Sequence, residues 1–235
     1  MTTAIHAVPM IDDELDVLAE LLPLAGRNII ELGCGAAGLA RKLVSHYTDS
    51  RVTGLEVDEC QHAKNLAAPQ AGLHFMAGVA QAIPFEAGSS DLVLMLKSLH
   101  HVPMPSLAHA LAEAARVLGP AGGHLHISEP VYAGPFNELI RLFNDEGVVR
   151  VAAQEAVDVA LLGGSWTQVT ERRFDMPVTF KDFADFEQCM LRPTFSDHHR
   201  RRHARASARR LRAVPRDGRS AFHAADARAL LRRSA

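Results

Sequence analysis

Short apolar runs alternate with amphipathic segments along the first 130 residues of the chain. The run 91–96 is apolar at nearly every position, as strands covered on both faces of a parallel sheet are. Strands that alternate with helices predict right-handed βαβ units and an open, doubly wound α/β sheet. The expected strands are residues 27–32, 52–57, 73–76, 91–96 and 124–128, and the expected helices are residues 11–22, 38–46, 58–67 and 105–118.

The pattern changes after residue 130, where the strand–helix alternation stops. Residues 134–162 are expected to be helical and residues 166–180 extended. A helix near 182–191, a basic helix near 197–213 and an apolar strand ending at Leu230–Leu231 follow. We therefore predict a core at 1–130, a helical cap at 131–165, and closing strands with an Arg-rich helix of the same domain at 166–235.

The composition is that of a globular protein. Hydrophobic residues make up 48% of the 235 positions and charged residues 22%. No apolar run approaches the ~20 residues that span a bilayer, and the first residues lack the pattern of a signal peptide. Cys34, Cys60 and Cys189 are widely spaced and form no CxxC pair. These observations predict a cytoplasmic protein without a membrane partner.

Charge is distributed unevenly along the chain. Residues 1–195 carry a net charge of −11, whereas residues 196–235 carry +9, and nine arginines lie between His198 and Arg219. A nucleic-acid-binding arm has this composition, and so has the solvated face of a surface helix. No aromatic residue is interleaved to stack on bases, which favours packing against the acidic body.

A glycine-rich turn follows the first expected strand. The segment Glu31-Leu-Gly-Cys-Gly-Ala-Ala-Gly38 permits close approach of the backbone to a ligand, and Glu56 ends the next strand, where a carboxylate can hold ribose hydroxyls. By itself this spacing fits nicotinamide, flavin and S-adenosylmethionine (AdoMet) sites equally. Glu31 separates them, because a carboxylate repels a pyrophosphate but attracts the sulfonium and ammonium groups of AdoMet.

Five motifs in order resemble the class I AdoMet-dependent methyltransferases. The closest type is the small-molecule one related to ubiquinone/menaquinone biosynthesis methyltransferases (methyltransferase type 11 domain). The resemblance covers residues 28–130 and implies a seven-stranded, mostly parallel Rossmann-like sheet with a helical insertion after strand 5. Its motifs are Ile29-Ile-Glu-Leu-Gly-Cys-Gly35, Val52-Thr-Gly-Leu-Glu-Val57, Gly78-Val-Ala-Gln-Ala-Ile-Pro-Phe85 with Ser89-Ser-Asp-Leu-Val93, Leu99-His-His-Val102 and Arg116-Val-Leu-Gly-Pro-Ala-Gly-Gly123.

The resemblance implies a cofactor role for each matching position. The methionine portion of AdoMet would be surrounded by the first motif, the ribose held at the end of the second strand, and the adenine bordered by the second and third motifs. The family usually has Asp where this chain has Val79, so the adenine amino group needs another acceptor here. The implied cofactor residues are Glu31, Gly33, Cys34 and Gly35 for methionine, Glu56 for ribose, Val57, Val79 and Ala80 for adenine, and the Lys97 backbone beside the sulfonium.

Candidate catalytic groups follow the fourth strand, where open α/β sheets place ligands. Lys97, Ser98, His100 and His101 lie there, and a histidine suits proton removal near neutral pH. Either histidine also fits a packing role. Methyl transfer is an in-line displacement on an activated cofactor, so a general base is needed only for a protonated acceptor.

Substrate and metal candidates lie outside these motifs. The segment after the fifth strand offers Tyr132, Arg141, Asn144 and Arg150 to orient a substrate, and the two arginines fit a carboxylate. Pairing of these arginines with Glu138 or Glu146 on a helix surface is the alternative. The histidines at 124–126 and 198–203 lack carboxylate or Cys partners at metal spacing, so no metal is expected.

The sequence thus predicts an AdoMet-dependent methyltransferase with a small-molecule acceptor. The alternatives are a non-catalytic AdoMet-binding or partner-binding module, an RNA methyltransferase and a nicotinamide-dependent oxidoreductase. Nucleic acid is not the expected partner, and a homodimer is compatible with the sequence. The acceptor atom is not specified by these residues.

Overall fold

The computed structural model describes residues 8–118, 122–187, 190 and 220–234. They fall into two compact units: a core unit of residues 14–129, 147–171 and 228–235, and an accessory unit of residues 1–13, 130–146 and 172–227. The strands are β1 Asn28–Leu32, β2 Arg51–Glu56, β3 Leu73–Ala77, β4 Leu92–Leu96, β5 His124–Pro130, β6 Trp166–Phe180 and β7 Ser220–Arg233. The helices are α1 Glu14–Leu21, α2 Gly38–His46, α3 Glu59–Leu66, α4 Leu107–Leu118, α5 Gly134–Ile140, α6 Gly147–Leu162 and α7 Phe183–Phe186, with short 3₁₀ turns η1 Leu99–His101 and η2 Met104–Ser106.

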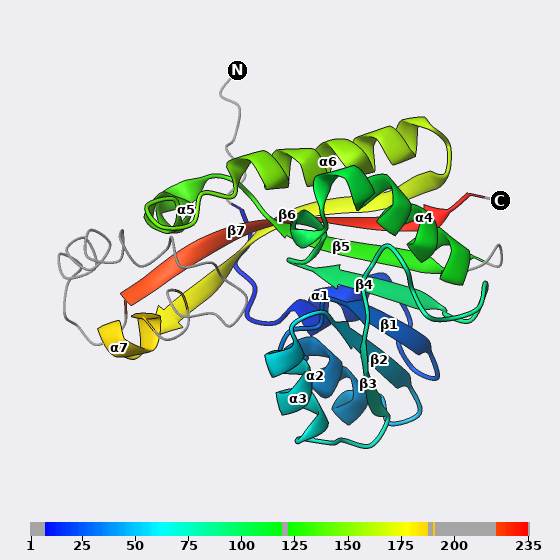
Figure 1. The fold of residues 1–235 in the computed structure, drawn as a ribbon. Helices are drawn as coiled ribbons and strands as arrows, with labels where there is room; N and C mark the ends of the chain where they lie inside the picture. Colours follow the sequence, from blue (N-terminus) through cyan, green and yellow to red (C-terminus); the bar gives the residue numbers. More distant parts are fainter. Residues whose placement is uncertain (1–7, 119–121, 188–189, 191–219, 235) are drawn as a thin grey trace. The chain divides into compact units, whose positions relative to one another are not determined.

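The strands form one seven-stranded sheet in the order β3-β2-β1-β4-β5-β7-β6 (Figure 1). The pairs β1–β2, β2–β3, β1–β4 and β4–β5 are all parallel. The chain winds outward from β1 to β3 and then returns to β4 on the other side of β1, so the strand order reverses between β1 and β4. The predicted doubly wound α/β fold is confirmed.

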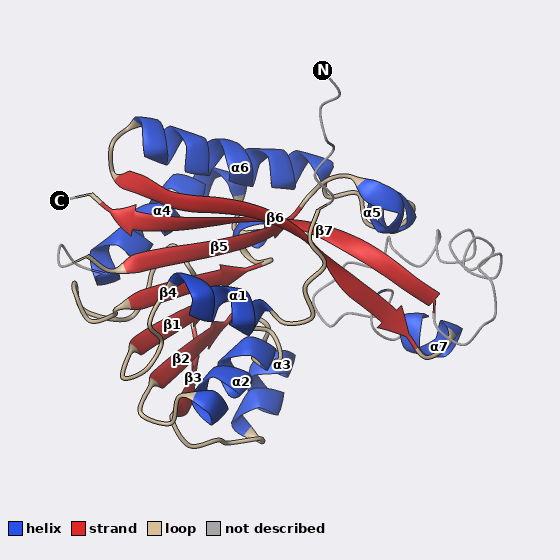
Figure 2. Cartoon of the chain, turned by 180° about the vertical axis from the view of Figure 1, so that it is seen from behind, coloured by secondary structure: helices blue, strands red, loops and turns tan. Residues whose placement is uncertain are grey.

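Alternate residues of the central strands build two cores on opposite faces of the sheet. Ile29 packs with α1 and α2, whereas its neighbour Ile30 packs with α4 and α6. The same alternation follows in β4. Leu94 packs in the core with α1 and α2, and Met95 packs in the core with α4 and α6. Figure 2 shows α1, α2 and α3 on the face opposite to that of α4 and α6. Among the described residues, no helix has the length and apolarity to span a bilayer.

The segment after β5 differs in one respect from its prediction. The continuous helical stretch expected at 134–162 is divided into α5 and α6, which belong to different units. The sequence Asn144-Asp-Glu-Gly147 between them is rich in residues that favour turns, and this explains the break. The extended segment 166–180 is confirmed as β6, and the basic helix predicted at 197–213 lies outside the described residues.

The accessory unit has a small aromatic core of its own. Phe180 and Phe186 meet edge to face, with ring centroids 5.1 Å apart, and Phe143 meets Phe186 in the same way at 6.0 Å. Leu139 and Ile140 of α5 complete this cluster. This aromatic cluster is distinct from the two cores of the sheet and stabilises the accessory unit by hydrophobic packing of its own.

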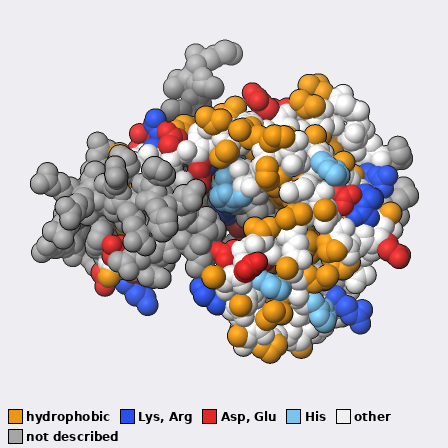
Figure 3. Space-filling view, viewed as in Figure 1, with side chains coloured by type: hydrophobic (Ala, Val, Ile, Leu, Met, Phe, Trp, Pro, Cys, Tyr) orange, Lys and Arg blue, Asp and Glu red, His pale blue; other side chains and the backbone are white. Residues whose placement is uncertain are grey.

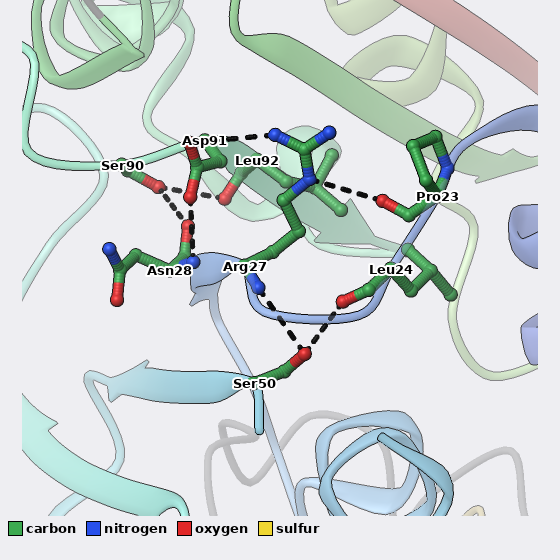
Figure 4. Close-up of polar contacts among 8 residues, drawn as sticks. All are labelled: Pro23, Leu24, Arg27, Asn28, Ser50, Ser90, Asp91 and Leu92. Carbon is green, nitrogen blue, oxygen red and sulfur yellow. Dashed lines mark hydrogen bonds and ion pairs between the residues drawn. The ribbon is translucent and has the colours of Figure 1, made fainter. Parts of the chain in front are cut away.

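Polar contacts connect the segments at the amino-terminal ends of β1, β2 and β4, along one edge of the sheet (Figure 4). The buried Ser50 hydroxyl donates to the Leu24 carbonyl at 2.6 Å and accepts from the Arg27 amide at 3.3 Å. The Asp91 carboxylate accepts from the Asn28 amide at 2.8 Å and lies 3.7 Å from the Arg27 guanidinium. This edge is opposite to the one where open α/β sheets bind ligands, so these contacts stabilise the fold.

Replacing Ser50 with alanine is expected to lower the free energy of unfolding by about 1–2 kcal/mol, because the half-buried Arg27 amide and the buried Leu24 carbonyl lose their common partner. Urea denaturation measures the change, and Ser89→Ala, which removes an exposed hydroxyl bonded to the Glu86 carbonyl, is the control. Equal stability of the two variants would contradict the structural role of Ser50.

Candidate functional site

The loop after β1 lies where the strand order reverses, at the carboxyl edge of the sheet. Gly33 and Gly35 have positive φ values of 66° and 53°, which glycine adopts without strain. A Cβ atom at Gly33 would lie 2.8 Å from Cβ of Ser98, whose hydroxyl donates to the Leu32 carbonyl at 2.7 Å. The loop thus packs closely against the segment after β4 at the switch point of the sheet, where such folds usually bind ligands.

A Gly33→Ala substitution tests this close packing. Both the left-handed backbone and the contact with Ser98 oppose the added methyl group, so the free energy of unfolding is expected to fall by about 2–4 kcal/mol. Gly164→Ala is the matched control, because Gly164 has φ 75° but no atom of the described residues would lie within 4 Å of an added Cβ. Urea denaturation should show a clearly smaller loss for Gly164→Ala; equal losses would mean that backbone strain alone acts at Gly33.

Glu31 is a buried acid directly before this loop. Its side chain is 3% exposed, and its Oε2 atom has no hydrogen-bond partner among the described residues. Burial raises the pKa of Glu31 to about 8; a hydrogen bond with the Ala40 backbone opposes the shift, and the charges of Glu14 and Glu56 add to it. A buried acceptor without a donor is costly, so this oxygen marks a position where a donor or a cation would be stabilised.

Glu56, at the end of β2, closes the other side of the loop. Its Oε2 accepts from the Gly35 amide at 2.7 Å, and its Oε1 accepts from the amides of Val57 and Asp58, both at 2.9 Å. A carboxylate has about four acceptor positions. Three are used by the backbone here, so Glu56 holds the glycine turn in shape and keeps one position for a further donor.

Cys34 packs beneath the turn rather than into it. Its side chain is 6% exposed, its amide donates to the Leu55 carbonyl at 3.0 Å, and a Cβ at Gly54 would lie 2.8 Å from its Sγ. Burial, with the charges of Glu31 and Glu56, raises the pKa of the Cys34 thiol to about 12. The side chain is a space-filling thiol rather than a nucleophile, and a ligand would meet its backbone.

The expected adenine positions are exposed apolar side chains on neighbouring strand ends. Val57 is 63% exposed and Val79 is 36% exposed, while Ala80 is half-buried against the core. Glu56 is in register with Ala77, and the Gly78 amide donates to the Glu56 carbonyl at 3.2 Å. The two valines therefore follow adjacent strands, as an apolar ring bound at this edge would require.

Lys97 connects the site to the first helix. It has a left-handed backbone with φ 54°, its amide donates to the Ser128 carbonyl at 2.6 Å, and its Nζ lies 3.0 Å from a Glu14 carboxylate oxygen. The other Glu14 oxygen accepts from the Ser128 hydroxyl at 2.6 Å. Glu14 thus ties α1 to the ends of β4 and β5. Sequence reasoning missed it, although an acid opening an amphipathic helix was visible.

His100 and His101 occupy different environments. His100 is 4% exposed, and its Nδ1 bonds to Oε2 of Glu129 at the end of β5, whereas His101 is exposed. The other Glu129 oxygen accepts from the Leu99 amide at 2.9 Å, which fixes the carboxylate. A carboxylate that holds one ring nitrogen orients the imidazole. Glu129 was missed by sequence reasoning, because pairing across two strand ends appears only in the fold.

The substrate candidates are not all in one unit. Tyr132 and Arg141 lie in the accessory unit, and Arg150 lies on α6 of the core unit. The Tyr132 hydroxyl donates to Asp145 at 2.5 Å, and Arg141 pairs with Glu138 at 3.0 Å and covers the Tyr132 ring. The alternative considered for Arg141, pairing on a helix surface, matches this geometry. A substrate role for these three residues stays a prediction.

Comparison with known proteins finds similarity over part of the chain. Residues 29–122 match the family described as "Methyltransferase domain". The phthiotriol/phenolphthiotriol dimycocerosates methyltransferase 1 of Mycobacterium ulcerans is 36% identical over 104 residues, 42% of this chain and 36% of that protein. The fatty-acid O-methyltransferase of Mycolicibacterium smegmatis is 32% identical over 145 residues, 59% of this chain and 50% of that protein. The chain thus spans half or less of the length of these curated relatives.

Solved structures share the fold at low sequence identity. The YcgJ protein from Bacillus subtilis has a TM-score of 0.64 at 15% identity and covers 94% of this chain and 98% of its own. The [4+2]-cyclase SpnF has a TM-score of 0.61 at 17% identity, with 98% and 87% covered. The expected Rossmann-like methyltransferase architecture is confirmed by this similarity.

Proposed function

We propose, on the premise that residues 29–122 form a class I methyltransferase domain, that this chain is an AdoMet-dependent enzyme that methylates a small molecule. The observation that carries the proposal is the buried Glu31 carboxyl, whose Oε2 lies without a donor from the described residues beside the glycine turn. A pyrophosphate at this turn would meet a carboxyl group, whereas a cationic cofactor would gain a partner.

The residues at the carboxyl edge of the sheet suit the amino-acid, ribose and adenine portions of AdoMet one by one. Glu31, Gly33, the Cys34 backbone and Gly35 suit a cationic amino-acid moiety, because the acid attracts the ammonium and the glycines let a ligand approach the turn closely. The remaining acceptor position of Glu56 suits a ribose hydroxyl. Further residues complete the set proposed: Val57, Val79 and Ala80 for adenine, with Lys97 beside the sulfonium.

AdoMet supplies an activated methyl group when bound, so the chain's own task is to orient the acceptor and to accept its proton where one must leave. His100 is the better base of the two histidines, because Glu129 holds its Nδ1 and fixes the orientation of the ring. His101, whose ring is tilted by 43° against that of His100 with the centroids 4.0 Å apart, is the second candidate.

The acceptor proposed is an apolar small molecule with a hydroxyl or carboxyl group. This proposal draws on the relatives, one of which is named for fatty-acid O-methylation. A base that removes a proton fits an oxygen acceptor. Thin-layer analysis of labelled methyl transfer to long-chain alcohols and fatty acids, compared with amines, would identify the class.

Calorimetric titration with AdoMet, S-adenosylhomocysteine and NADPH tests the cofactor. We expect both adenosyl compounds to bind and NADPH to give no heat of binding. Tight NADPH binding without a response to the adenosyl compounds would refute the proposal and favour the nicotinamide-dependent oxidoreductase.

A second candidate is an AdoMet-binding protein that does not transfer the methyl group. This candidate is considered because the chain shares its fold with the [4+2]-cyclase SpnF, and one fold can carry different reactions. Formation of S-adenosylhomocysteine from AdoMet in the presence of an acceptor separates the two. Binding without any turnover over the acceptor panel would favour this second candidate.

A further inference from the structure

Helix α6 is apolar on two opposite faces. Ala153 and Val157, which are 1% and 5% exposed, pack into the core shared with β5 and α4. The opposite face is also rich in large apolar side chains, and only three of the sixteen residues are charged. The outward face therefore exposes more large apolar side chains than a helix that packs on one side only needs.

The outward residues form a stripe along the helix. Val148, Val151, Val159 and Leu162 are 73%, 53%, 66% and 88% exposed. We call these four residues the α6 stripe. Figure 3 shows hydrophobic side chains along α6 at the top of the view, interrupted by an acidic group. Single exposed apolar residues are ordinary, but four on one helix face are typical of an interaction surface.

The stripe is symmetric about the middle of the helix. Val151 and Val159 each lie four residues from Glu155, and Val148 and Leu162 each lie seven residues from it. At about 3.6 residues per turn, all five positions share one face. Two such helices packed antiparallel about a two-fold axis at Glu155 would bring Val151 against Val159 of the second copy and Val148 against its Leu162. A two-fold interface requires this self-complementarity.

We propose that the α6 stripe is the contact surface of a homodimer, in which α6 pairs with α6 of a second copy of this chain. The proposal stands apart from the proposed function, since it depends only on the helix. The contact surface is small, because a 16-residue helix is about 24 Å long. The two Glu155 carboxylates meet near the two-fold axis and repel each other. The dimer is therefore a weak, reversible one, with an expected dissociation constant of about 10–100 µM.

Sedimentation equilibrium of the full chain between 1 and 500 µM tests the assembly. The wild-type chain is expected to show a monomer–dimer equilibrium, and Val151→Glu should weaken it at least tenfold, since each dimer buries two added charges. Leu66→Glu, at the end of α3 on the opposite side of the sheet, is the matched control, because Leu66 is an exposed apolar residue at 55%. Circular dichroism confirms that each variant is folded.

Two further variants test the register. Glu155→Gln should tighten the dimer several-fold, because it removes a like-charge pair at the axis. In a Cys60→Ser, Cys189→Ser background, Glu155→Cys should form an intermolecular disulfide under mild oxidation, whereas Val148→Cys should not, because its symmetry mate would lie about 20 Å away along the helices.

Three results would overturn the proposal. A wild-type chain that is monomeric at 500 µM would exclude the dimer. Equal weakening by Leu66→Glu would place the contact elsewhere, as would crosslinking through Val148→Cys but not Glu155→Cys. Binding of the monomeric chain to phosphatidylcholine vesicles, lost in Val151→Glu, would instead assign the stripe to a lipid surface.

Discussion

Replacing Glu31 with glutamine is expected to stabilise the ligand-free protein at pH 8 while weakening AdoMet binding at least tenfold. Burial raises the pKa of Glu31 to about 8 in the folded chain, against 4.5 for the free side chain. Between these two pH values the unfolded chain has lost the proton that the folded chain retains. The favourable contribution of this group is therefore complete below pH 4.5 and is lost as the pH rises to about 8.

The size of this effect follows from the proton count. One retained proton gives a slope of up to about 1.4 kcal/mol per pH unit, so we expect a loss on the order of 3 kcal/mol between pH 5 and pH 8. Glutamine is always neutral and removes this slope. Urea denaturation at pH 5, 6, 7 and 8 measures it, and Glu59→Gln, an exposed acid on α3, is the control. Parallel pH profiles for wild type and Glu31→Gln would show that Glu31 ionises normally.

Binding completes this test. A cationic ligand at Glu31 favours the ionised carboxylate, so AdoMet binding near pH 7 should release a proton. Calorimetry in two buffers with different ionisation enthalpies measures that release, and Glu31→Gln should abolish it together with most of the affinity. Unchanged affinity in the variant would remove the electrostatic basis of the proposed function, even if the stability profile agreed.

The fold could be predicted from the sequence because its signals are local. Residues 91–96 are apolar on both faces, and Gly33 to Gly38 mark a strand–helix turn, so a parallel, doubly wound sheet could be predicted. The order of its strands was not predicted and comes from the structure. The predicted positions of β6 and of the strand ending at Leu230–Leu231 were confirmed as well. The break between α5 and α6 was missed, since the turn at residues 144–147 lies inside an otherwise helical pattern.

The site could be predicted only in part. Glu31 and Glu56 were visible because a motif fixes their distance from the glycines. The burial of Glu31 and the three backbone amides that bind Glu56 were not, because they depend on how the strands and the turn pack together. The same holds for Glu14 and Glu129, which act through partners 83 and 29 residues away. Such pairs carry no sequence spacing that predicts them.

The His100–Glu129 pair gives the largest expected effect on catalysis. On the proposed function, His100→Ala should lower kcat about 100-fold with an oxygen acceptor, which is the usual contribution of a positioned general base. Glu129→Gln should lower kcat by about tenfold, because an amide holds the His100 ring less firmly than a carboxylate does. The glutamine oxygen can still accept from the Leu99 amide.

Release of S-adenosylhomocysteine over pH 5.5–9 measures both effects, and His74→Ala, an exposed histidine on β3, is the control. The unfolding temperature of each variant separates a catalytic pair from a structural one, because loss of packing alone would lower that temperature together with kcat. His101→Ala tests the second histidine in the same assay. Unchanged kcat in His100→Ala, or a larger loss in His101→Ala than in His100→Ala, would exclude His100 as the base.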